Sequence, residues 1–495
     1  MRAGGRASES HQTLQRRNFA LGKNATGRVF SVSLRRRWLG NSLVNMTGGL
    51  ATAGVNVLLP AVVVHHLTAE SFSVWNLALQ MAVYVNLLSM GLQTATARAV
   101  AHAAEAGPSG QTRLPVIVHA ARSIAQGASG VAVLMVALLV AFYPLMFPSV
   151  SPGMVSDFRF TLALFGAAAV TQIMAQVDMG VFQGLHRNSV FVGTQMLVRL
   201  LTVFAVWLAV QLQQPMVILA AVMAAATALL WPAMRTVFVR GLPWASEVAT
   251  AVLDRACRRD LLHYCGSLSV WSVCMLLVNS AGIVLVGRMD FVMAGPYAIA
   301  MTAATVLVGL LGAVLSPLMT TAAALNANPE TRSQLPALLT RSTLGVAVGL
   351  NLLALFVNVL HPWILSLWVG ESFVSSTGPL LVVLVMAHCL RNIGAPYALM
   401  LLATGLHKRA LISAVFEGVA NLLASIVMGF YWGALGVAFG SLLGSLVGIV
   451  GMFAMNAHRT PELTPQPVRI TFFAFVGPML VFAPLHYVAL ERVLN

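Results

Sequence analysis

The chain has 495 residues, of which 58% are apolar and only 9% are charged, and its formal net charge is +15. Soluble domains carry about a quarter charged residues, so this composition excludes an ordinary soluble globule. The mean hydropathy of +0.84 indicates a helical protein embedded in a membrane.

The first 37 residues are rich in arginine and serine and contain one acidic residue, Glu9. They end in Arg35-Arg36-Arg37, directly before the first long apolar run. Two interpretations are open: a basic cytoplasmic tail that helps to set orientation, or an organelle transit peptide. A secretory signal is not expected, because the apolar run that follows is too long and lacks a small-residue cleavage pattern.

Apolar runs of about 20 or more residues follow, each long enough to cross a bilayer as a helix. They predict twelve core spans and a thirteenth near the end of the chain, at 38–64, 72–98, 114–147, 158–184, 190–212, 215–238, 263–287, 293–322, 343–367, 377–403, 409–431, 434–456 and 470–490. Basic residues concentrate in alternate loops, which predicts a cytoplasmic N-terminus by the positive-inside rule. Topology therefore explains the net charge, and we expect no nucleic-acid partner.

Two polar breaks between spans, about 221 residues apart, have nearly the same sequence: Gly184-Leu185-His186-Arg187 and Gly405-Leu406-His407-Lys408. Six spans separate the copies, so both halves enter the membrane in the same orientation. The sequence therefore predicts an all-α membrane protein of two six-helix bundles, 38–239 and 263–456, related by a parallel internal repeat. This is a usual design of secondary transporters.

Segments outside the bundles are predicted as follows. Residues 240–262 interleave charged and apolar side chains, which predicts a short amphipathic helix on the cytoplasmic surface. Residues 457–495 are predicted to form a cytoplasmic loop and the extra span. With thirteen crossings, Asn495 would face the periplasm.

Two further patterns concern helix packing and the membrane interface. Glycines spaced three or four residues apart in the twelfth span, from Gly433 to Gly448, predict a closely packed helix face. Aromatic residues near span ends, among them Trp75 and Trp368, are predicted to lie in the membrane interface. Trp75 also matches Tyr297 at almost the same offset as the repeated polar break.

Four ionisable residues lie deep in predicted spans, where a charge is expensive and needs an explanation. They are Asp178, Arg199, Arg391 and Glu417, in the fourth, fifth, tenth and eleventh spans. One interpretation is two structural ion pairs, Asp178 with Arg199 and Arg391 with Glu417. The other places the arginines in an aqueous cavity, where the planar guanidinium suits an anionic head group. The carboxylates would then couple transport to H⁺ or Na⁺. Both interpretations stay open here.

Uncharged polar residues also occur within the first, second and seventh spans. Asn45, Asn56, Asn76, Gln80, Asn86 and Asn279 are candidates for a sugar-binding cavity, although hydrogen bonding between helices explains them equally well.

Several motifs of known chemistry are missing from the sequence. It has no Gly-x-x-x-x-Gly-Lys-Ser/Thr loop for ATP, no HExxH and no Gly-x-Ser-x-Gly. The four cysteines have no metal-like spacing and indicate neither disulfides nor zinc. A membrane-embedded glycosyltransferase or polymerase would need a large extramembrane segment, whereas the longest connection is about 240–262. We therefore expect a secondary-type transporter without cofactor or metal, not an enzyme.

The first hairpin resembles a known family. It reads Leu67-Thr68-Ala69-Glu70-Ser71-Phe72-Ser73-Val74-Trp75-Asn76-Leu77-Ala78, then Gly91-Leu92 and the basic Arg98. This order resembles the opening of the polysaccharide transporter (Wzx-type flippase) family in the MOP (multidrug/oligosaccharidyl-lipid/polysaccharide) exporter superfamily. The turn at Gly184 and the run Trp363-Ile364-Leu365-Ser366-Leu367-Trp368-Val369-Gly370 are similar to family motifs after the fourth and ninth spans. The resemblance covers roughly 38–456.

The resemblance implies a MATE-like core with a central cavity in the inner (cytoplasmic) membrane of a bacterium. The implied activity is the flipping of a polyprenyl-diphosphate-linked oligosaccharide by alternating access. Such an activity serves surface polysaccharides such as exopolysaccharide or the O-antigen of lipopolysaccharide. H⁺ or Na⁺, membrane lipids and polysaccharide polymerases are the implied partners.

This chain departs from the family pattern in two places. Ser73 stands where a glycine is common, and spans one, two, seven and eight carry no buried charge. Arg199 and Arg391 are therefore the main substrate-binding candidates, and Asp178 and Glu417 the ion-coupling candidates. Two alternatives remain in the same superfamily: a lipid II flippase, and a cation-coupled multidrug antiporter that would use a deep acid such as Asp178.

Overall fold

The computed structural model describes residues 47–49, 51–89, 91–327, 329–456, 459–464 and 477–494. Within these ranges every regular element is a helix, which confirms the predicted all-α membrane fold. Ten helices of the described chain are long and apolar enough to cross a membrane. The predicted basic tail at 1–37 lies outside the described residues.

The N-terminal half is built around α6 (Val155–Gly184), which packs against helices on all sides. Its first helix is Thr47–Val64. The second predicted span is broken at Gly91, whose φ of +67° is left-handed. The other elements are α2 (Ala69–Asn86), η1 (Leu87–Ser89), α3 (Leu92–Glu105), α4 (Pro108–Gln111), α5 (Leu114–Met146), η2 (Pro152–Met154), α7 (Asn188–Gln211), α8 (Met216–Ala228) and α9 (Leu230–Gly241).

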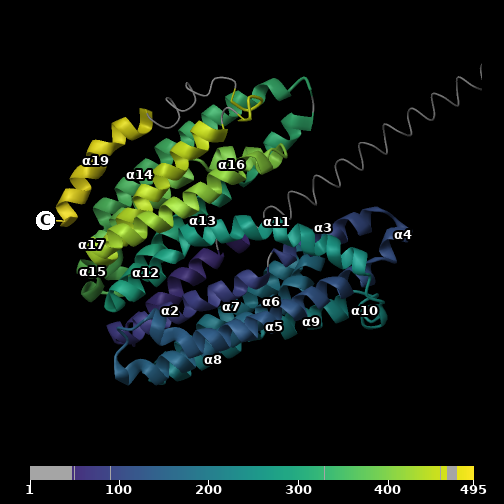
Figure 1. Cartoon of the computed structure of the whole chain (residues 1–495), viewed down its shortest axis with the longest axis horizontal. Coiled ribbons are helices and arrows are strands. Elements are labelled where there is room, and N and C mark those ends of the chain that lie inside the picture. The colour runs from purple at the N-terminus through teal and green to yellow at the C-terminus, as the bar shows by residue number, and fades with distance from the viewer. Residues whose placement is uncertain are drawn as a thin grey trace, which may run out of the picture.

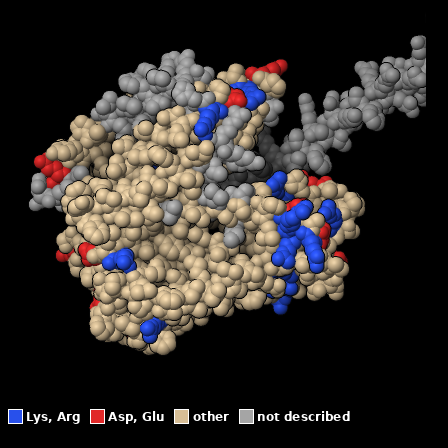
Figure 2. Space-filling model, viewed as in Figure 1, with Lys and Arg blue, Asp and Glu red and all other residues tan. Residues whose placement is uncertain are grey.

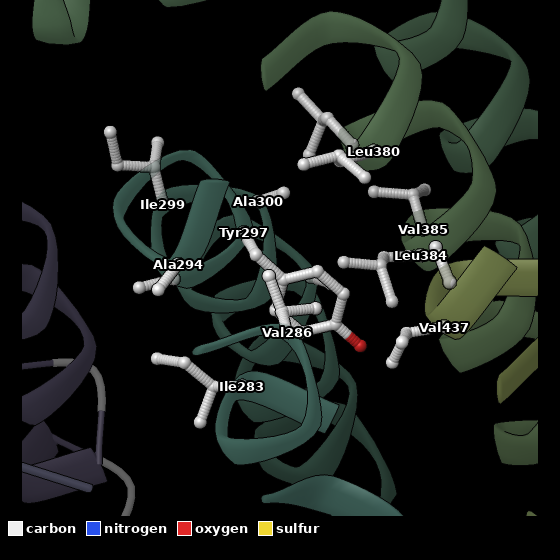
Figure 3. Packing of buried hydrophobic residues seen from close by; sticks show 14 of the residues in the cluster. Ile283, Val286, Ala294, Tyr297, Ile299, Ala300, Leu380, Leu384, Val385 and Val437 are labelled. Atoms are coloured by element: carbon white, nitrogen blue, oxygen red, sulfur yellow. The ribbon is translucent and has the colours of Figure 1, made fainter. Parts of the chain in front are cut away.

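The C-terminal half is built around α15 (Val374–Asn392), which packs against α13 (Ala294–Ala327), α14 (Leu335–Val369) and α17 (His407–Asn456). Tyr297 of α13 is buried among apolar side chains of α12, α15 and α17 (Figure 3). The remaining elements are α11 (Arg255–Asn279), α12 (Ala281–Met289), η3 (Phe291–Met293), η4 (Arg332–Gln334), η5 (Glu371–Phe373), α16 (Ala395–Ala403) and α19 (Gly477–Leu494).

The two groups of helices lie side by side, with α2, α11, α12 and α13 where they meet (Figure 1). We call the end at which α2 and α13 begin the outer end, and the end at which α5 and α14 begin the inner end. The charge distribution predicts that the inner end faces the cytoplasm. The short elements α4 and α10 (Glu247–Thr250) lie at this inner end, on the right of the view. α19 packs along α14.

The internal repeat is visible in the helix boundaries, but its register differs from the sequence match. α6 begins at Val155 and α15 at Val374, 219 residues later, and α7 and α17 begin at Asn188 and His407, with the same offset. The two Gly-Leu-His sequences, which match at an offset of 221 residues, are therefore two residues out of structural register.

The reason is the way each helix ends. A left-handed residue closes α6 at His186 (φ 57°) and the equivalent helix α16 at Gly405 (φ 76°). The following backbone N–H then bonds five residues back, from Arg187 to the Phe182 carbonyl and from Leu406 to the Leu401 carbonyl. One half uses histidine for a position that the other gives to glycine.

The linker between the halves differs from the prediction. The amphipathic helix expected within 240–262 is reduced to the single turn α10, and α11 begins at Arg255. The cause is Asp254, whose carboxylate accepts hydrogen bonds from the N–H groups of Ala256 and Cys257 and so starts a new helix. The charged residues 255–260 therefore form the first turns of the helix that leads into the predicted seventh span, 263–287.

The glycines of the twelfth span pack closely, as predicted. α17 contains two spans joined at Trp432 and Gly433, and the second folds back along the first. A Cβ on Gly440 would overlap the backbone of Ser425, and one on Gly444 would overlap that of Asn421. The two spans therefore form one closely packed antiparallel pair.

We predict that Gly440→Ala lowers the free energy of unfolding by about 1–3 kcal/mol, because the added methyl group forces two backbones apart. Gly451→Ala is the matched control, since the nearest atom to its added Cβ is 3.6 Å away. Thermal unfolding in detergent, followed by tryptophan fluorescence, compares the two variants. Equal stability of both would contradict the close packing.

Candidate functional site

A cavity of about 340 Å³ lies inside the N-terminal half, between the first helix and α2, α6, α7 and α8. Its wall combines apolar side chains with amides and hydroxyls. Arg199 is the one charged residue among the described residues that line it. The polar lining residues are Asn56, Asn86, Gln172, Gln195, Arg199, Thr202 and Thr227.

Arg199 has few protein partners in this cavity. Its Nη1 donates a hydrogen bond to Thr52 Oγ1, and the Thr52 hydroxyl in turn donates to the Gly48 carbonyl at 2.8 Å. No carboxylate forms an ion pair with Arg199 within the described part of the chain. A guanidinium carries five N–H donors, so most of its donor capacity remains for a bound anion.

The amides on the cavity wall are only partly satisfied. Asn86 Nδ2 donates to Gln172 Oε1 at 3.2 Å, which joins α2 to α6. Asn86 Oδ1 is buried without a partner among the described residues. A buried amide oxygen without a donor is costly, so it marks a place for a ligand hydroxyl or a water molecule.

Two of the uncharged residues considered from the sequence, Asn56 and Asn86, line this cavity, whereas others do not. Asn76 donates to the Phe72 carbonyl of its own helix at 2.8 Å, and Gln80 Nε2 is buried without a described partner. Neither is among the lining residues. Asn45 and the side chain of Asn279 lie outside the described residues. Sequence reasoning singled out Arg199 but missed Gln172 and Gln195.

Asp178 does not pair with Arg199, and that prediction was wrong. Its carboxylate accepts a hydrogen bond from Arg122 Nη2 at 2.8 Å, and Asp178 is only 1% exposed. Depth explains the choice of partner. Measured from the inner end of its own helix, Arg122 lies roughly 12 Å along α5 and Asp178 roughly 9 Å along α6. Arg199 lies roughly 16 Å along α7, measured from the same end of the molecule.

Aromatic packing completes the environment of this ion pair. The ring of Phe238 on α9 lies 4.5 Å from Arg122 Cζ and 5.3 Å from Arg235 Cζ. Asp178 is not among the residues that line the Arg199 cavity. Asp178 therefore stabilises the packing of the N-terminal half through its ion pair with Arg122, and a second arginine, Arg235, lies close to this pair.

In the C-terminal half the second predicted ion pair is present. Arg391 Nε lies 3.8 Å from Glu417 Oε1, and both side chains are largely buried. Arg391 Nη2 also hydrogen-bonds His388 Nδ1 at 2.9 Å. In the structural register of 219 residues, Arg391 corresponds to Gln172 and Glu417 to Val198, the neighbour of Arg199. In the C-terminal half, Glu417 thus neutralises Arg391. In the N-terminal half, Arg199 lies on a cavity wall without a carboxylate partner among the described residues.

The two halves are hydrogen-bonded to each other at the outer end. Ser73 Oγ donates to the Val292 carbonyl at 3.0 Å and accepts from the Gly295 N–H at 3.1 Å. Ser73 lies near the start of α2 and Gly295 near the start of α13, so this contact lies where the two halves meet. The serine that departs from the family pattern therefore supplies a hydroxyl that joins the halves.

Two tryptophans predicted for the membrane interface make contacts inside the protein. Trp368 Nε1 donates to the Val57 carbonyl at 2.8 Å, which links α14 to the first helix. Trp75 is only 2% exposed and packs edge-on against Phe165, with ring centroids 5.0 Å apart. Trp368 therefore joins the two halves, whereas Trp75 packs between α2 and α6 within the N-terminal half.

No protein-family model and no curated protein sequence matches the chain. Among solved structures it is similar to a lipid II flippase MurJ in an inward closed conformation, with a TM-score of 0.65 at 11% identity over 92% of this chain and 98% of that one. An inward-facing multidrug resistance MATE transporter of the MOP superfamily gives 0.65 at 15% identity, over 86% and 99%. An outward-facing MATE transporter gives 0.53 at 15% identity, over 85% and 95%.

These likenesses define the fold. The chain has the fold of MOP superfamily transporters, as its two-bundle architecture predicts.

Proposed function

We propose that this chain is a secondary transporter that flips an anionic, lipid-linked substrate across the membrane by alternating access. The observation that carries the proposal is Arg199, a guanidinium on a cavity wall without a carboxylate among the described lining residues. A cavity of this polarity favours an anion over a cation, because a bound cation would face an uncompensated positive charge.

The cavity volume indicates which part of the substrate it takes. At about 340 Å³ it lies at the small end of ligand pockets, which span roughly 300–1,000 Å³. It suits a diphosphate or a first sugar, not a whole oligosaccharide. A polyprenyl-diphosphate-linked oligosaccharide fits this picture, with the diphosphate at Arg199, the first sugar at the unsatisfied amides and the prenyl chain in lipid.

The alternative of a cation-coupled multidrug antiporter is less well supported. It would use a deep acid in the N-terminal half, but Asp178 is held by Arg122 and does not line the cavity. A lipid II flippase shares the polyprenyl diphosphate chemistry, so only the glycan separates it from the proposed activity.

The C-terminal half is the proposed place of ion coupling. Glu417 Oε1 lacks a hydrogen bond within the described residues and lies close to Arg391. Protonation of Glu417 would release Arg391 for a second contact with the substrate. We place the protein in a bacterial inner membrane with a cytoplasmic N-terminus, where polysaccharide polymerases would take up the flipped substrate.

The test uses the full chain in proteoliposomes with a polyprenyl-diphosphate-linked disaccharide that carries an NBD fluorophore. Dithionite, which does not cross the membrane, quenches the outer leaflet, so flipping makes the inner-leaflet probe accessible. We expect protein-dependent quenching of the diphosphate lipid and none of the matching polyprenyl glycoside without phosphate. Uptake of a cationic dye together with an immobile diphosphate lipid would refute the flippase and favour the antiporter.

A further inference from the structure

A second and larger cavity, of about 700 Å³, lies at the inner end of the molecule, separate from the Arg199 cavity. α3, α4 and α5 of the N-terminal half form its walls on one side, and the beginning of α11 forms the other. Basic residues with acidic ones among them gather at this end of the surface (Figure 2). Nothing in the proposed translocation uses this pocket.

The charges that line the pocket are balanced. Arg98 and Arg113 supply two positive charges, and Asp254 and Asp260 supply two negative ones. His102 and Tyr264 add polar groups to the rim. Ser109 adds a hydroxyl and Cys257 a thiol, and the rest of the wall is made mainly of small apolar residues such as Ala95, Ala99 and Ala103. A ligand that matches this lining carries both signs of charge next to an apolar part.

The groups available to a ligand are not equivalent. Arg98 Cζ lies 4.6 Å from the centre of the Tyr264 ring, so a cation–π contact between the two halves holds this guanidinium in place. Asp254 is already engaged, because it caps the start of α11. Asp260 is exposed and forms no ion pair within the described chain. An anionic group therefore has Arg98 and Arg113, and a cationic group has Asp260.

We propose that this pocket binds the head group of an aminophospholipid, with the phosphate between Arg98 and Arg113 and the ammonium at Asp260. The alanine-lined wall takes the start of the acyl chains. A purely anionic head group would meet two carboxylates, and a choline head group offers no N–H to Asp260. Because the walls come from both halves, the bound lipid ties α11 to α3 and α5. This inference is independent of the proposed flippase activity.

The chain contains its own reporter of pocket occupancy. Cys257 lines the pocket and is partly exposed, whereas the other three cysteines are buried. Cys257 precedes the predicted seventh span, and burial, together with the nearby Asp254, raises the pKa of its thiol. Labelling with a water-soluble maleimide is therefore measured at about pH 8, where more of the thiolate is present.

The experiment measures the labelling rate of the full chain in nanodiscs of phosphatidylcholine that contain added phosphatidylethanolamine or phosphatidylglycerol. We expect phosphatidylethanolamine to slow labelling about five-fold, as mass action gives for a mostly occupied site. Glycerophosphoethanolamine added to the detergent-solubilised protein should protect Cys257 in the same way and excludes an effect of bilayer charge. Cys257→Ser must abolish labelling.

Variants separate head-group recognition from other effects on the thiol. For each variant, the labelling rate is measured with and without phosphatidylethanolamine. In Arg113→Gln and in Asp260→Asn the two rates should be equal. Arg258→Gln, on the same helix but outside the pocket lining, should keep the difference between the two rates. Equal rates in all three lipids would overturn the site. Stronger protection by phosphatidylglycerol than by phosphatidylethanolamine would overturn the zwitterionic assignment and leave an anion site.

Discussion

Asp178→Ala should be the most destabilising of the substitutions considered, with a loss of about 3–5 kcal/mol in the free energy of unfolding. The substitution leaves the guanidinium of Arg122 in the N-terminal bundle without the carboxylate that it contacts at 2.8 Å. Arg235 contacts the same Phe238 ring and adds a like charge close by. Thermal unfolding in detergent and the monodisperse fraction on size exclusion measure the loss.

The partner of Asp178 is tested by exchanging charges. Asp178→Arg combined with Arg122→Asp should recover much of the stability that either single substitution removes, because the pair is re-formed in reverse. Asp178→Arg combined with Arg199→Asp is the matched control and should recover nothing. Recovery in the second double variant alone would restore the pair expected from the sequence and contradict the observed contact.

Arg199→Leu should reduce flipping of the diphosphate lipid by at least about 30-fold, since loss of one member of a buried charge pair typically costs about 2–5 kcal/mol of binding. The variant should fold normally, because Arg199 has Thr52 as its hydrogen-bond partner and no described carboxylate depends on it. The dithionite assay gives the rate, and the thermal midpoint gives the stability.

Two comparisons make this result specific to anion binding. Arg199→Lys keeps the charge without the planar fork, so its flipping rate should lie between those of the wild type and the leucine variant. Arg159→Leu, which removes an arginine at the outer end of α6 and outside the cavity lining, should flip at the wild-type rate. Wild-type flipping by Arg199→Leu would remove the observation on which the proposed function depends.

Local patterns in the sequence predicted much of the fold. Hydropathy placed the spans, because each must match the thickness of the bilayer whatever its neighbours are. The glycine row of the twelfth span predicted a close contact, since few other arguments explain glycines at this spacing within a helix. The Arg391–Glu417 pair could be proposed because the two helices follow each other in the chain and a long arginine side chain can bridge a difference in depth.

Partners that depend on the arrangement of helices were not predictable in this way. Asp178 has Arg122 as its partner because α5 and α6 are packed together at matching depth, and a search limited to the deepest arginines passed over Arg122. Gln172 became notable through its place on the cavity wall and its structural equivalence with Arg391, which the 221-residue sequence match conceals. Ser73 and Trp368 form hydrogen bonds between the two halves. The sequence of one span does not predict such a contact, because the contact depends on how the halves pack together.

The Arg122–Asp178 contact also bears on how the chain is made. α5 emerges from the ribosome before α6, and an arginine in the hydrocarbon region costs about 3 kcal/mol during insertion by the translocon. A hairpin in which the guanidinium meets a carboxylate at 2.8 Å would offset part of that cost, because the attraction between the two charges compensates some of their lost hydration. The third span would then wait at the translocon for the fourth. Biogenesis would thus proceed in pairs of helices at this point, with the ion pair as the signal for release into the bilayer.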